Sequence, residues 1–400
     1  MGLLFRRYEG REVLTQIGVL SLTLFFFSLA SAFTGTIWAI YLDQFFGSEA
    51  IVGLVSGGFI LLAILSSFVL VPIVQRSNKR KLLLHSLFWI FVTYVLFSII
   101  GENLSLLILL GIAASVLGTL RATSFGIIVK DKSRRNLLSR NEGLTYTFAN
   151  VAFVIGPLVA GFLLLKLSVQ HVFLFAGLFV FVAFWIFKIS KINDANIEKN
   201  TNKSLLKNLK AFFKKKDYFG IYFIRLGLAF WWSLIYIFMP LFIIRNGLGV
   251  EWVGYFLFAV AVPLILTEYQ FAKFAGKNGF KKIFKLGYLI VAITVSACFF
   301  VGNIYFILSL LIFASFGMAM LEPTTISYFL DLLKKKDENR FFGPFSTGDS
   351  LGALLGRILP AIVLIFLPFK YIFLFFGLVM FLMFLMCFTI KDIVEKRRKG

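Results

Sequence analysis

The sequence is poor in the residues that soluble enzymes and secreted domains depend on. Charged residues make up 15 % of its 400 residues, and it has two cysteines and two histidines. Cys298 and Cys387 both lie in apolar runs, so we expect no disulfide framework. His85 and His171 are too few for a histidine metal site. The sequence also has no Gly-x-x-x-x-Gly-Lys-Ser/Thr loop for nucleotide phosphates and no His-Glu-x-x-His zinc motif. We therefore expect no enzyme, no cofactor and no ATP-driven reaction.

Apolar residues, in contrast, are abundant. They form 60 % of the chain, against roughly 45–50 % in an ordinary globular protein. Basic residues number 41 and acidic residues 19, which gives a formal charge of +22. Such a charge suggests nucleic acid in a soluble protein, but this composition predicts an integral membrane protein. The expected partner is the lipid bilayer, and we expect no nucleic acid.

The apolar residues occur in long runs between clusters of charge. A helix needs about 20 mostly apolar residues to cross the hydrocarbon core. No stretch shows the ten-residue alternation of a transmembrane β-barrel, so we expect helices. The twelve predicted spans are 13–42, 50–75, 82–100, 104–130, 143–166, 170–188, 217–244, 251–272, 283–301, 304–330, 343–367 and 370–390.

The basic residues are distributed unevenly between the two ends of these spans. With a cytoplasmic N-terminus, nearly all of them fall in cytoplasmic segments, and Lys166, Arg245 and Lys370 fall outside. Cytoplasmic loops of membrane proteins carry an excess of Lys and Arg. We therefore expect a multi-pass protein of the plasma membrane or bacterial inner membrane with both termini in the cytoplasm.

The chain also repeats itself at an offset of 200 residues. Residues 171–184 and 371–384 are identical at half of their positions, including Gly177 and Gly377. The repeat predicts two pseudo-symmetric six-helix bundles, 1–190 and 217–400. The basic linker 191–216 between them ends in a predicted amphipathic helix, which we expect on the anionic inner leaflet. Docking of a protein partner is the alternative for this helix.

Twelve spans in two parallel halves resemble the major facilitator superfamily over essentially the whole chain. The family's loop between spans 2 and 3 reads Gly-x-Leu-Ala-Asp-Arg-x-Gly-Arg-Lys. Residues 71–81 and 272–282 are similar to it, although Gln75 stands at the Asp position. The resemblance implies gating at the cytoplasmic ends of these helices, with Asp349 and Glu268 pairing with bases such as Arg76 or Lys277. We expect the gating residues to be Gln75, Arg76, Arg80, Gly156, Pro157, Glu268, Lys277, Gly279 and Asp349.

Span 5 carries a second resemblance. Its Gly143, Ala152, Gly156-Pro157 and Gly161 are similar to the Gly-x8-Gly-x3-Gly-Pro-x2-Gly-Gly pattern of the family's antiporters. Small residues allow two helices to approach closely, and proline bends a helix. In the family this pattern is associated with export in exchange for protons. The alternative is a packing seam without bearing on direction.

Three ionisable residues fall deep within spans that line the cavity in the family. They are Arg121 on span 4, Arg225 on span 7 and Glu322 on span 10. A charge at the bilayer centre is costly, so each is a functional candidate. Burial favours a protonated carboxyl and a nearby guanidinium favours the ionised one, so we expect Glu322 to carry the proton and both arginines to switch it. A static ion pair and binding of an anionic substrate by both arginines remain alternatives. Arg357 also lies deep, and the sequence assigns it no partner.

Aromatic and hydroxyl side chains accompany these charges. Few polar groups among aromatic ones suit amphipathic or drug-like molecules better than sugars, although ordinary packing also explains the aromatic residues. The expected cavity residues are Thr34, Trp38, Arg121, Thr123, Arg225, Trp231, Trp232, Tyr236, Glu322 and Thr325.

These observations predict a monomeric secondary active transporter. We expect it to export a small amphipathic molecule by alternating access, with the proton as coupling ion. The alternatives are an importer or facilitator of a metabolite or anionic solute, and a non-transporting sensor or lipid scramblase on the same fold.

Overall fold

The computed structural model describes residues 5–8, 11–133, 138–190, 192–194, 205–333 and 337–393. These residues form two compact units. Unit 1 lies within Met1–Phe45 and Phe59–Thr201, and unit 2 lies within Phe46–Gly58 and Asn202–Gly400. The turn after the first helix and the beginning of the second helix therefore pack within unit 2.

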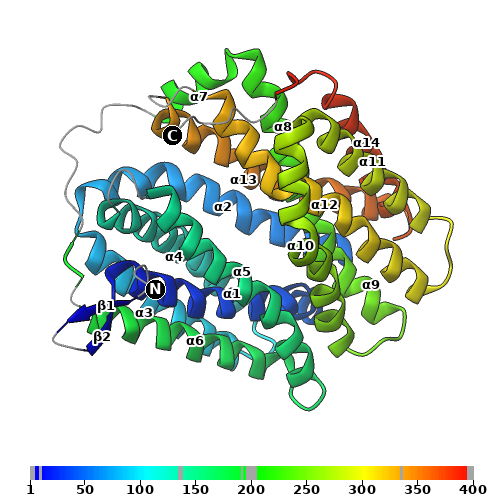
Figure 1. Cartoon of the computed structure of the whole chain (residues 1–400). Helices are drawn as coiled ribbons and strands as arrows, with labels where there is room; N and C mark the ends of the chain where they lie inside the picture. Colours follow the sequence, from blue (N-terminus) through cyan, green and yellow to red (C-terminus); the bar gives the residue numbers. More distant parts are fainter. Residues whose placement is uncertain are drawn as a thin grey trace. The chain divides into compact units, whose positions relative to one another are not determined.

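The first half of the chain forms six long helices (Figure 1). They are α1 (Gln16–Phe46), α2 (Glu49–Arg76), α3 (Lys79–Phe97), α4 (Leu104–Lys132), α5 (Leu138–Leu164) and α6 (Val169–Ile189). In unit 1, α3 packs against both α4 and α6.

The second half opens with the short helix α7 (Leu205–Phe213) and then forms six further helical stretches. The first stretch is continuous through α8 (Lys216–Ser233), the π-helix η1 (Leu234–Phe238) and α9 (Met239–Arg245). The others are α10 (Glu251–Asn278), α11 (Phe280–Cys298), α12 (Ile304–Leu332), α13 (Glu338–Phe366) and α14 (Tyr371–Met386). In unit 2, α11 packs against α12 and α14, as α3 packs against α4 and α6 in unit 1.

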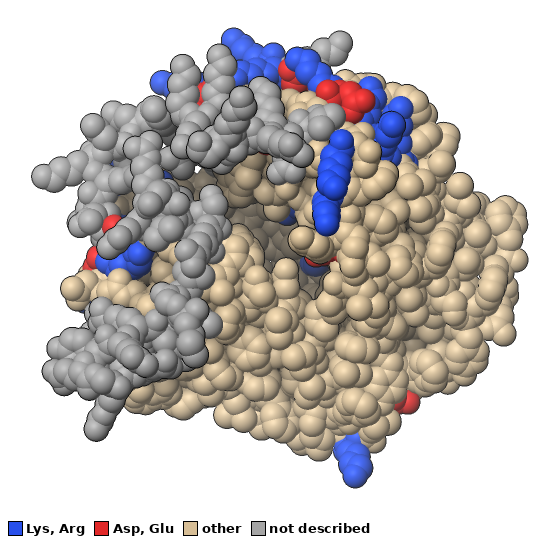
Figure 2. Space-filling view, in the orientation of Figure 1, with Lys and Arg blue, Asp and Glu red and all other residues tan. Residues whose placement is uncertain are grey.

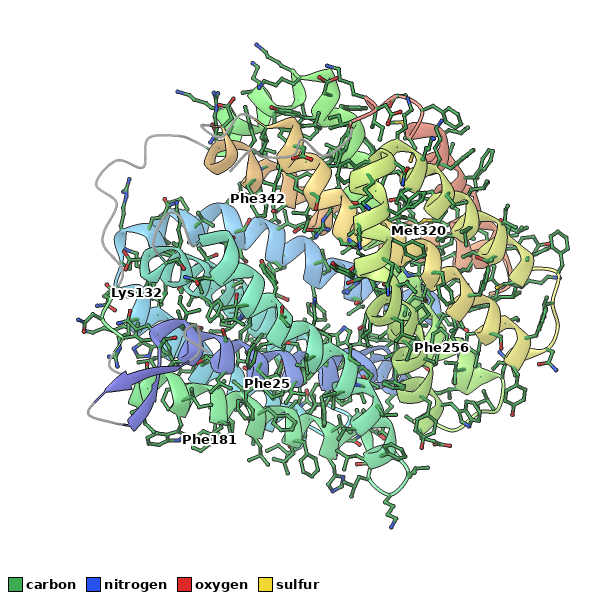
Figure 3. The ribbon with its side chains drawn as sticks, viewed as in Figure 1. Phe25, Lys132, Phe181, Phe256, Met320 and Phe342 are labelled. Carbon is green, nitrogen blue, oxygen red and sulfur yellow. The ribbon has the colours of Figure 1, made fainter. Side chains whose placement is uncertain are left out.

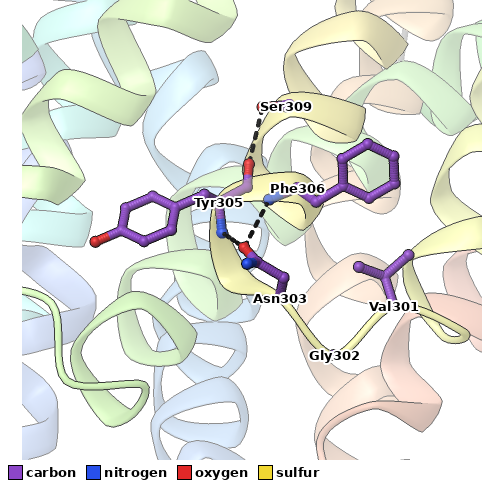
Figure 4. A pocket seen from close by; sticks show the side chains of 6 residues that line it. All are labelled: Val301, Gly302, Asn303, Tyr305, Phe306 and Ser309. Atoms are coloured by element: carbon purple, nitrogen blue, oxygen red, sulfur yellow. Dashed lines mark hydrogen bonds between the residues drawn. The ribbon is translucent and has the colours of Figure 1, made fainter.

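The bounds of these helices repeat along the chain. Helix α4 spans Leu104–Lys132 and α12 spans Ile304–Leu332, an offset of 200 residues. Each begins after an asparagine cap: Asn103 Oδ1 accepts from Leu106 N at 3.0 Å. Asn303 Oδ1 accepts from Tyr305 N at 2.9 Å and Phe306 N at 3.3 Å (Figure 4). The sequence repeat therefore corresponds to a structural repeat that extends to the helix ends.

Ten of the described helical stretches are long and apolar enough to cross a membrane by length and composition. Helix α11, with three lysines in its first turns, and the 16-residue α14 account for the other two predicted spans. The predicted all-α membrane fold is confirmed. One addition is a short antiparallel hairpin before α1, formed by β1 (Phe5–Tyr8) and β2 (Arg11–Leu14) with Phe5 opposite Leu14.

The outer helices expose one apolar face and bury the other. On α6, Leu174, Leu178 and Trp185 are exposed while Phe173 and Ala176 on the other side are fully buried. In Figure 2 the charged side chains in view gather along the upper edge, and most of the remaining described surface carries none. In the core of unit 2, Phe256 on α10 and Met320 on α12 are buried (Figure 3). An apolar outer surface over a packed apolar core is what a lipid environment requires.

Helix α7 of the predicted linker packs against unit 2. Its Phe212 is fully buried and packs against the aromatic rings of Tyr218, Phe329 and Phe341, at centroid distances of 5.2, 6.1 and 6.1 Å. Phe212 therefore docks α7 onto unit 2, while the neighbouring Phe213 is exposed. Residues 191 and 195–204 of the predicted linker lie outside the described residues.

Candidate functional site

Helices α8 and α13 approach each other closely because α13 carries a glycine at every fourth position. A Cβ atom added at Gly356 would lie 2.9 Å from the Phe230 carbonyl oxygen, and one at Gly348 would lie 3.3 Å from the Tyr222 carbonyl oxygen. Small residues of this spacing bring two helix backbones together. Asp349, the residue after Gly348, consequently lies beside α8.

Asp349 forms a two-pronged ion pair with Arg225 of α8. Arg225 Nε lies 2.6 Å from Asp349 Oδ1, and Arg225 Nη2 donates to Oδ2 at 3.0 Å. Asp349 was expected to pair with Arg76 or Lys277, and that partner assignment is wrong in this structure. The close approach of α8 and α13 decides which residues pair. The Asp349 carboxylate then compensates the positive charge of Arg225.

Glu322 on α12 has a neutral partner. Trp232 Nε1 on α8 donates to Glu322 Oε1 at 2.6 Å. The ring of Trp232 lies 5.6 Å from that of Tyr236, one helical turn further on. Glu268 is close enough to Glu322 for their charges to interact. Unit 2 therefore gathers two carboxyl groups, an indole donor and a phenol near the compensated Arg225–Asp349 pair.

A local widening of the helix holds Tyr236 in place. Residues 234–238 form one π-helical turn, in which Met239 N donates to Leu234 O five residues back. Pro240 follows at the start of α9 and has no amide hydrogen to donate. A single π-turn inside an α-helix is frequent at functional sites, and the sequence analysis did not predict this one.

Two predicted cavity residues lie in the packed core instead. Trp231 and Thr325 have no exposed surface, and the Thr325 hydroxyl donates to Leu321 O at 2.5 Å. Trp232 and Tyr236, on the neighbouring face of the same helix, are partly exposed. The expectation that Trp231 and Thr325 line a cavity is therefore wrong in this structure, because helix rotation turns both of them inward.

Arg121 is the corresponding deep charge of unit 1. Its guanidinium carbon lies 3.9 Å from the centre of the Phe27 ring on α1. Tyr94 of α3 interacts electrostatically with Arg121, and the Thr34 hydroxyl lies near the Tyr94 phenol. Within the described part of the chain, Arg121 Nε is buried without a hydrogen-bond partner, and no carboxylate pairs with the side chain. Arg121 is thus surrounded by aromatic and hydroxyl groups.

The two other predicted cavity residues of unit 1 differ in setting. Trp38 packs against Phe59, Phe97 and Phe173, with ring centroids 5.9, 5.8 and 6.5 Å away. This supports the ordinary packing role that the sequence left open. Thr123 lies two residues after Arg121 on α4 and is partly exposed.

Gly156 on α5 lies against α1. A Cβ atom at this position would lie 2.5 Å from Ala32 Cβ, so only glycine allows this approach. Pro157 follows it, and α5 continues through the proline as one helix. By contrast, a Cβ at Gly143 would meet no atom within 4 Å, so the close contact is confined to the middle of the motif.

The beginning of α3 is hydrogen-bonded to the end of α6 in unit 1. Arg80 Nη2 donates to the carbonyl oxygens of Lys188 and Ser190, both at 3.3 Å, at the end of α6. Asp194 Oδ1 in return accepts from Arg80 N at 3.0 Å. A cation that binds the last carbonyls of a helix satisfies acceptors that have no partner within that helix. We call this arrangement the unit 1 clasp.

The same arrangement recurs in unit 2 as the unit 2 clasp. Lys281 Nζ donates to the carbonyl oxygens of Phe388 and Ile390, at 2.8 and 3.0 Å. Gly279 has φ +97°, and a Cβ there would lie 2.7 Å from Asp392 Oδ1. Arg80 and Lys281 are thus engaged in closing helix ends, which the family motif did not lead us to expect.

Arg357, for which the sequence named no partner, bonds to the beginning of α2. Its Nη1 donates to Ser56 Oγ at 2.8 Å and to Ser56 O at 3.2 Å. Gly53 permits this contact, since a Cβ there would lie 2.8 Å from Ala361 Cβ. The remaining gating candidates are less engaged: Arg76 and Lys277 are exposed, and Gln75 is partly exposed.

Two further features resemble sites. Residues 348–352 read Gly-Asp-Ser-Leu-Gly, the Gly-x-Ser-x-Gly pattern of a hydrolase nucleophile, but they lie inside α13 instead of at a turn between strand and helix. A surface pocket at the turn between α11 and α12 is lined by uncharged residues (Figure 4). Within the described residues, no group of three His, Cys, Asp or Glu side chains suits a metal ion.

Comparisons with known proteins agree with this architecture. The chain is 21 % identical over 351 residues to an uncharacterized MFS-type transporter of Methanocaldococcus jannaschii, covering 86 % of this chain and 89 % of that protein. It is 26 % identical over 267 residues to the staphylopine export protein of Staphylococcus aureus, covering 63 % and 66 %. A solved POT family transporter in complex with 5-aminolevulinic acid has the same fold, with a TM-score of 0.75 at 11 % identity, covering 92 % of this chain and 94 % of that one.

A sequence model of the Major Facilitator Superfamily matches residues 20–277 and 254–400, which together span nearly all of the chain. The deep charged residues and the repeated bounds of α4 and α12 fall inside these matches. This chain is therefore a member of the major facilitator superfamily, a family of membrane transporters.

Proposed function

We propose that this protein is a secondary active transporter that exports a small amphipathic molecule in exchange for protons. Export is supported by the similarity to the staphylopine export protein and by Gly156-Pro157 on α5, which resembles the antiporter pattern. In this proposal residues 1–190 and 217–400 are the two moving bodies, 191–216 joins them, and both termini are cytoplasmic in a plasma or bacterial inner membrane.

The observation that carries the proposal is the contact of Glu322 with Trp232. An indole N–H donates to an ionised carboxylate, and it can also donate, more weakly, to the carbonyl oxygen of a protonated carboxyl group. Glu322 therefore keeps its 2.6 Å partner while it gains and loses a proton. A carboxylate locked to an arginine lacks this freedom, because protonation breaks the ion pair. Glu322 is thus the proton carrier of the proposal.

The other polar groups have separate roles. Arg225 is compensated by Asp349 at 2.6 Å, so it tunes the field at Glu322 instead of binding the proton carrier directly. Trp232 and Tyr236 offer partly exposed aromatic surface beside Glu322, which suits the apolar part of an amphipathic substrate. Transport of this kind forms no covalent intermediate.

The test is proton-coupled transport by the purified protein in lipid vesicles. The probes are three dansyl derivatives of similar size: dansylglycine, its neutral amide and a dansyl ethylenediamine that carries an amine. An imposed pH gradient should drive at least one of them, and collapse of the gradient should stop it. Glu322→Gln should abolish coupling, while the matched control Glu102→Gln, an exposed carboxylate at the α3–α4 turn, should retain it. Full coupled transport by Glu322→Gln would contradict the proposal, as would transport indifferent to the gradient.

A further inference from the structure

Two of the three deep arginines have protein acceptors among the described residues. Arg225 is bound by Asp349, with atoms 2.6 and 3.0 Å apart, and Arg357 by Ser56, at 2.8 and 3.2 Å. Within the described part of the chain, Arg121 Nε is buried without a hydrogen-bond partner, and no carboxylate pairs with the side chain. A guanidinium removed from water without an acceptor is costly. The cost of burying such a guanidinium is offset where a bound ligand supplies the missing acceptor.

The surroundings of Arg121 indicate what kind of acceptor fits. Phe27 covers one face of the guanidinium at 3.9 Å, and the side chain as a whole keeps some exposed surface. Stacking on an aromatic face leaves the edge of the guanidinium free, and its N–H groups lie along that edge. Two parallel N–H groups of an arginine match the two oxygens of a carboxylate. Tyr94 and Thr34 add hydroxyl groups nearby.

We propose that Arg121 is the anchor for a carboxylate group of the transported substrate, whose apolar part packs among the aromatic side chains of unit 1. The proposal rests on the proposed transport function and adds the charge of the substrate to it. It also separates two roles: the proton is carried at Glu322 in unit 2, and the anionic group is bound at Arg121 in unit 1. Arg225 takes no part in anion binding, since Asp349 already compensates its charge.

The charge of the substrate has a measurable consequence. If one proton enters for each substrate molecule that leaves, export of a monoanion moves two charges per cycle, export of a neutral molecule moves one, and export of a monocation moves none. Each charge moved across a potential of 100 mV changes the attainable concentration ratio roughly 50-fold. The three dansyl probes therefore differ in their response to membrane potential.

The decisive measurement is binding, because it needs no proton coupling. Energy transfer from tryptophan to the dansyl group in detergent-purified protein gives the affinity of dansylglycine and of its neutral amide. We expect a preference of roughly tenfold to 100-fold for the carboxylate, as a charge-assisted hydrogen bond supplies. Arg121→Gln should remove this preference, and Arg121→Lys should restore part of it. Lys166→Gln, which removes an exposed positive charge, should leave it unchanged.

The outcomes distinguish this inference from the proposed function. If Glu322→Gln loses coupled transport but keeps the carboxylate preference, both are supported. If the native protein binds the amide or the amine probe as well as dansylglycine, or binds none of them, Arg121 is not a carboxylate anchor. If the preference survives in a correctly folded Arg121→Gln variant, checked by its elution as a single species, the anion binds elsewhere and the inference is wrong. If Arg121→Gln loses the carboxylate preference while proton coupling stays intact, that result would support the carboxylate anchor at Arg121 alone.

Discussion

The Arg225–Asp349 ion pair should contribute measurably to the stability of unit 2. Two unit charges 4 Å apart interact by about 4 kcal/mol at an effective dielectric constant of about 20. The side chains are 21 % and 41 % exposed, so water screens part of this energy. We expect a coupling free energy of about 1–3 kcal/mol between the two residues.

A double-mutant cycle measures this coupling. The variants are Arg225→Met, Asp349→Ala and their combination, and the assay is the free energy of unfolding in detergent. Each single change leaves one charge without its partner, so the double variant should lose less stability than the two single losses added together. The control cycle uses Lys391 and Asp217, whose charged atoms are also 2.6 Å apart but whose side chains are 64 % and 38 % exposed. Its coupling should stay within about 1 kcal/mol.

Additive losses in the Arg225–Asp349 cycle would refute this reasoning. So would a coupling no larger than that of the exposed control pair. Either result would mean that the close approach of α8 and α13 positions the two residues without stabilising the protein through their charges.

Three further predictions concern packing and helix ends. Gly156→Leu should separate α1 from α5 and lower both the unfolding temperature and the transport rate. The control Gly143→Ala, with open space around it, should lower neither the unfolding temperature nor the transport rate. Phe212→Ala should cost about 3–5 kcal/mol of unfolding free energy, because it empties a buried aromatic site; a surface-bound α7 would instead show a loss below about 1 kcal/mol. Arg80→Ala and Lys281→Ala should each free the segment after the sixth helix of their unit, seen as faster proteolysis there, and unchanged cleavage would contradict the clasps.

The membrane fold was predictable because lipid imposes a simple rule. A backbone in hydrocarbon must satisfy its hydrogen bonds within the segment, so each crossing needs a long apolar helix. The long apolar runs between charge clusters therefore predicted these helices directly. The hairpin Phe5–Leu14 and the π-turn at 234–238 were not predicted. The π-turn comes directly before Met239-Pro240, but a proline in an apolar helix does not by itself indicate a π-turn.

The deep charged residues could be picked out from the sequence, but their pairing partners could not. Arg121, Arg225 and Glu322 are conspicuous in sequence because charges are rare in apolar spans. Which helix face each one occupies is harder to predict, since a helix that is apolar all round has no amphipathic stripe to orient it. That is why Trp231 and Thr325 were assigned to a cavity. The pairing of Arg225 with Asp349 had one usable signal, the glycines at every fourth position of α13.

The two clasps also affect how membrane topology can be tested by charge. Arg80 and Lys281 add positive charge to segments that we expect in the cytoplasm. They also bind backbone carbonyl oxygens at the end of α6 and just after α14. Reversing the charge of Arg80 or Lys281 would disturb membrane insertion of the chain and also loosen the segment that the residue binds. The two effects could therefore not be separated. Arg76 and Lys277, exposed one turn before each clasp, carry the same charge without that second duty. They are the positions at which an inverted topology could be attributed to charge alone.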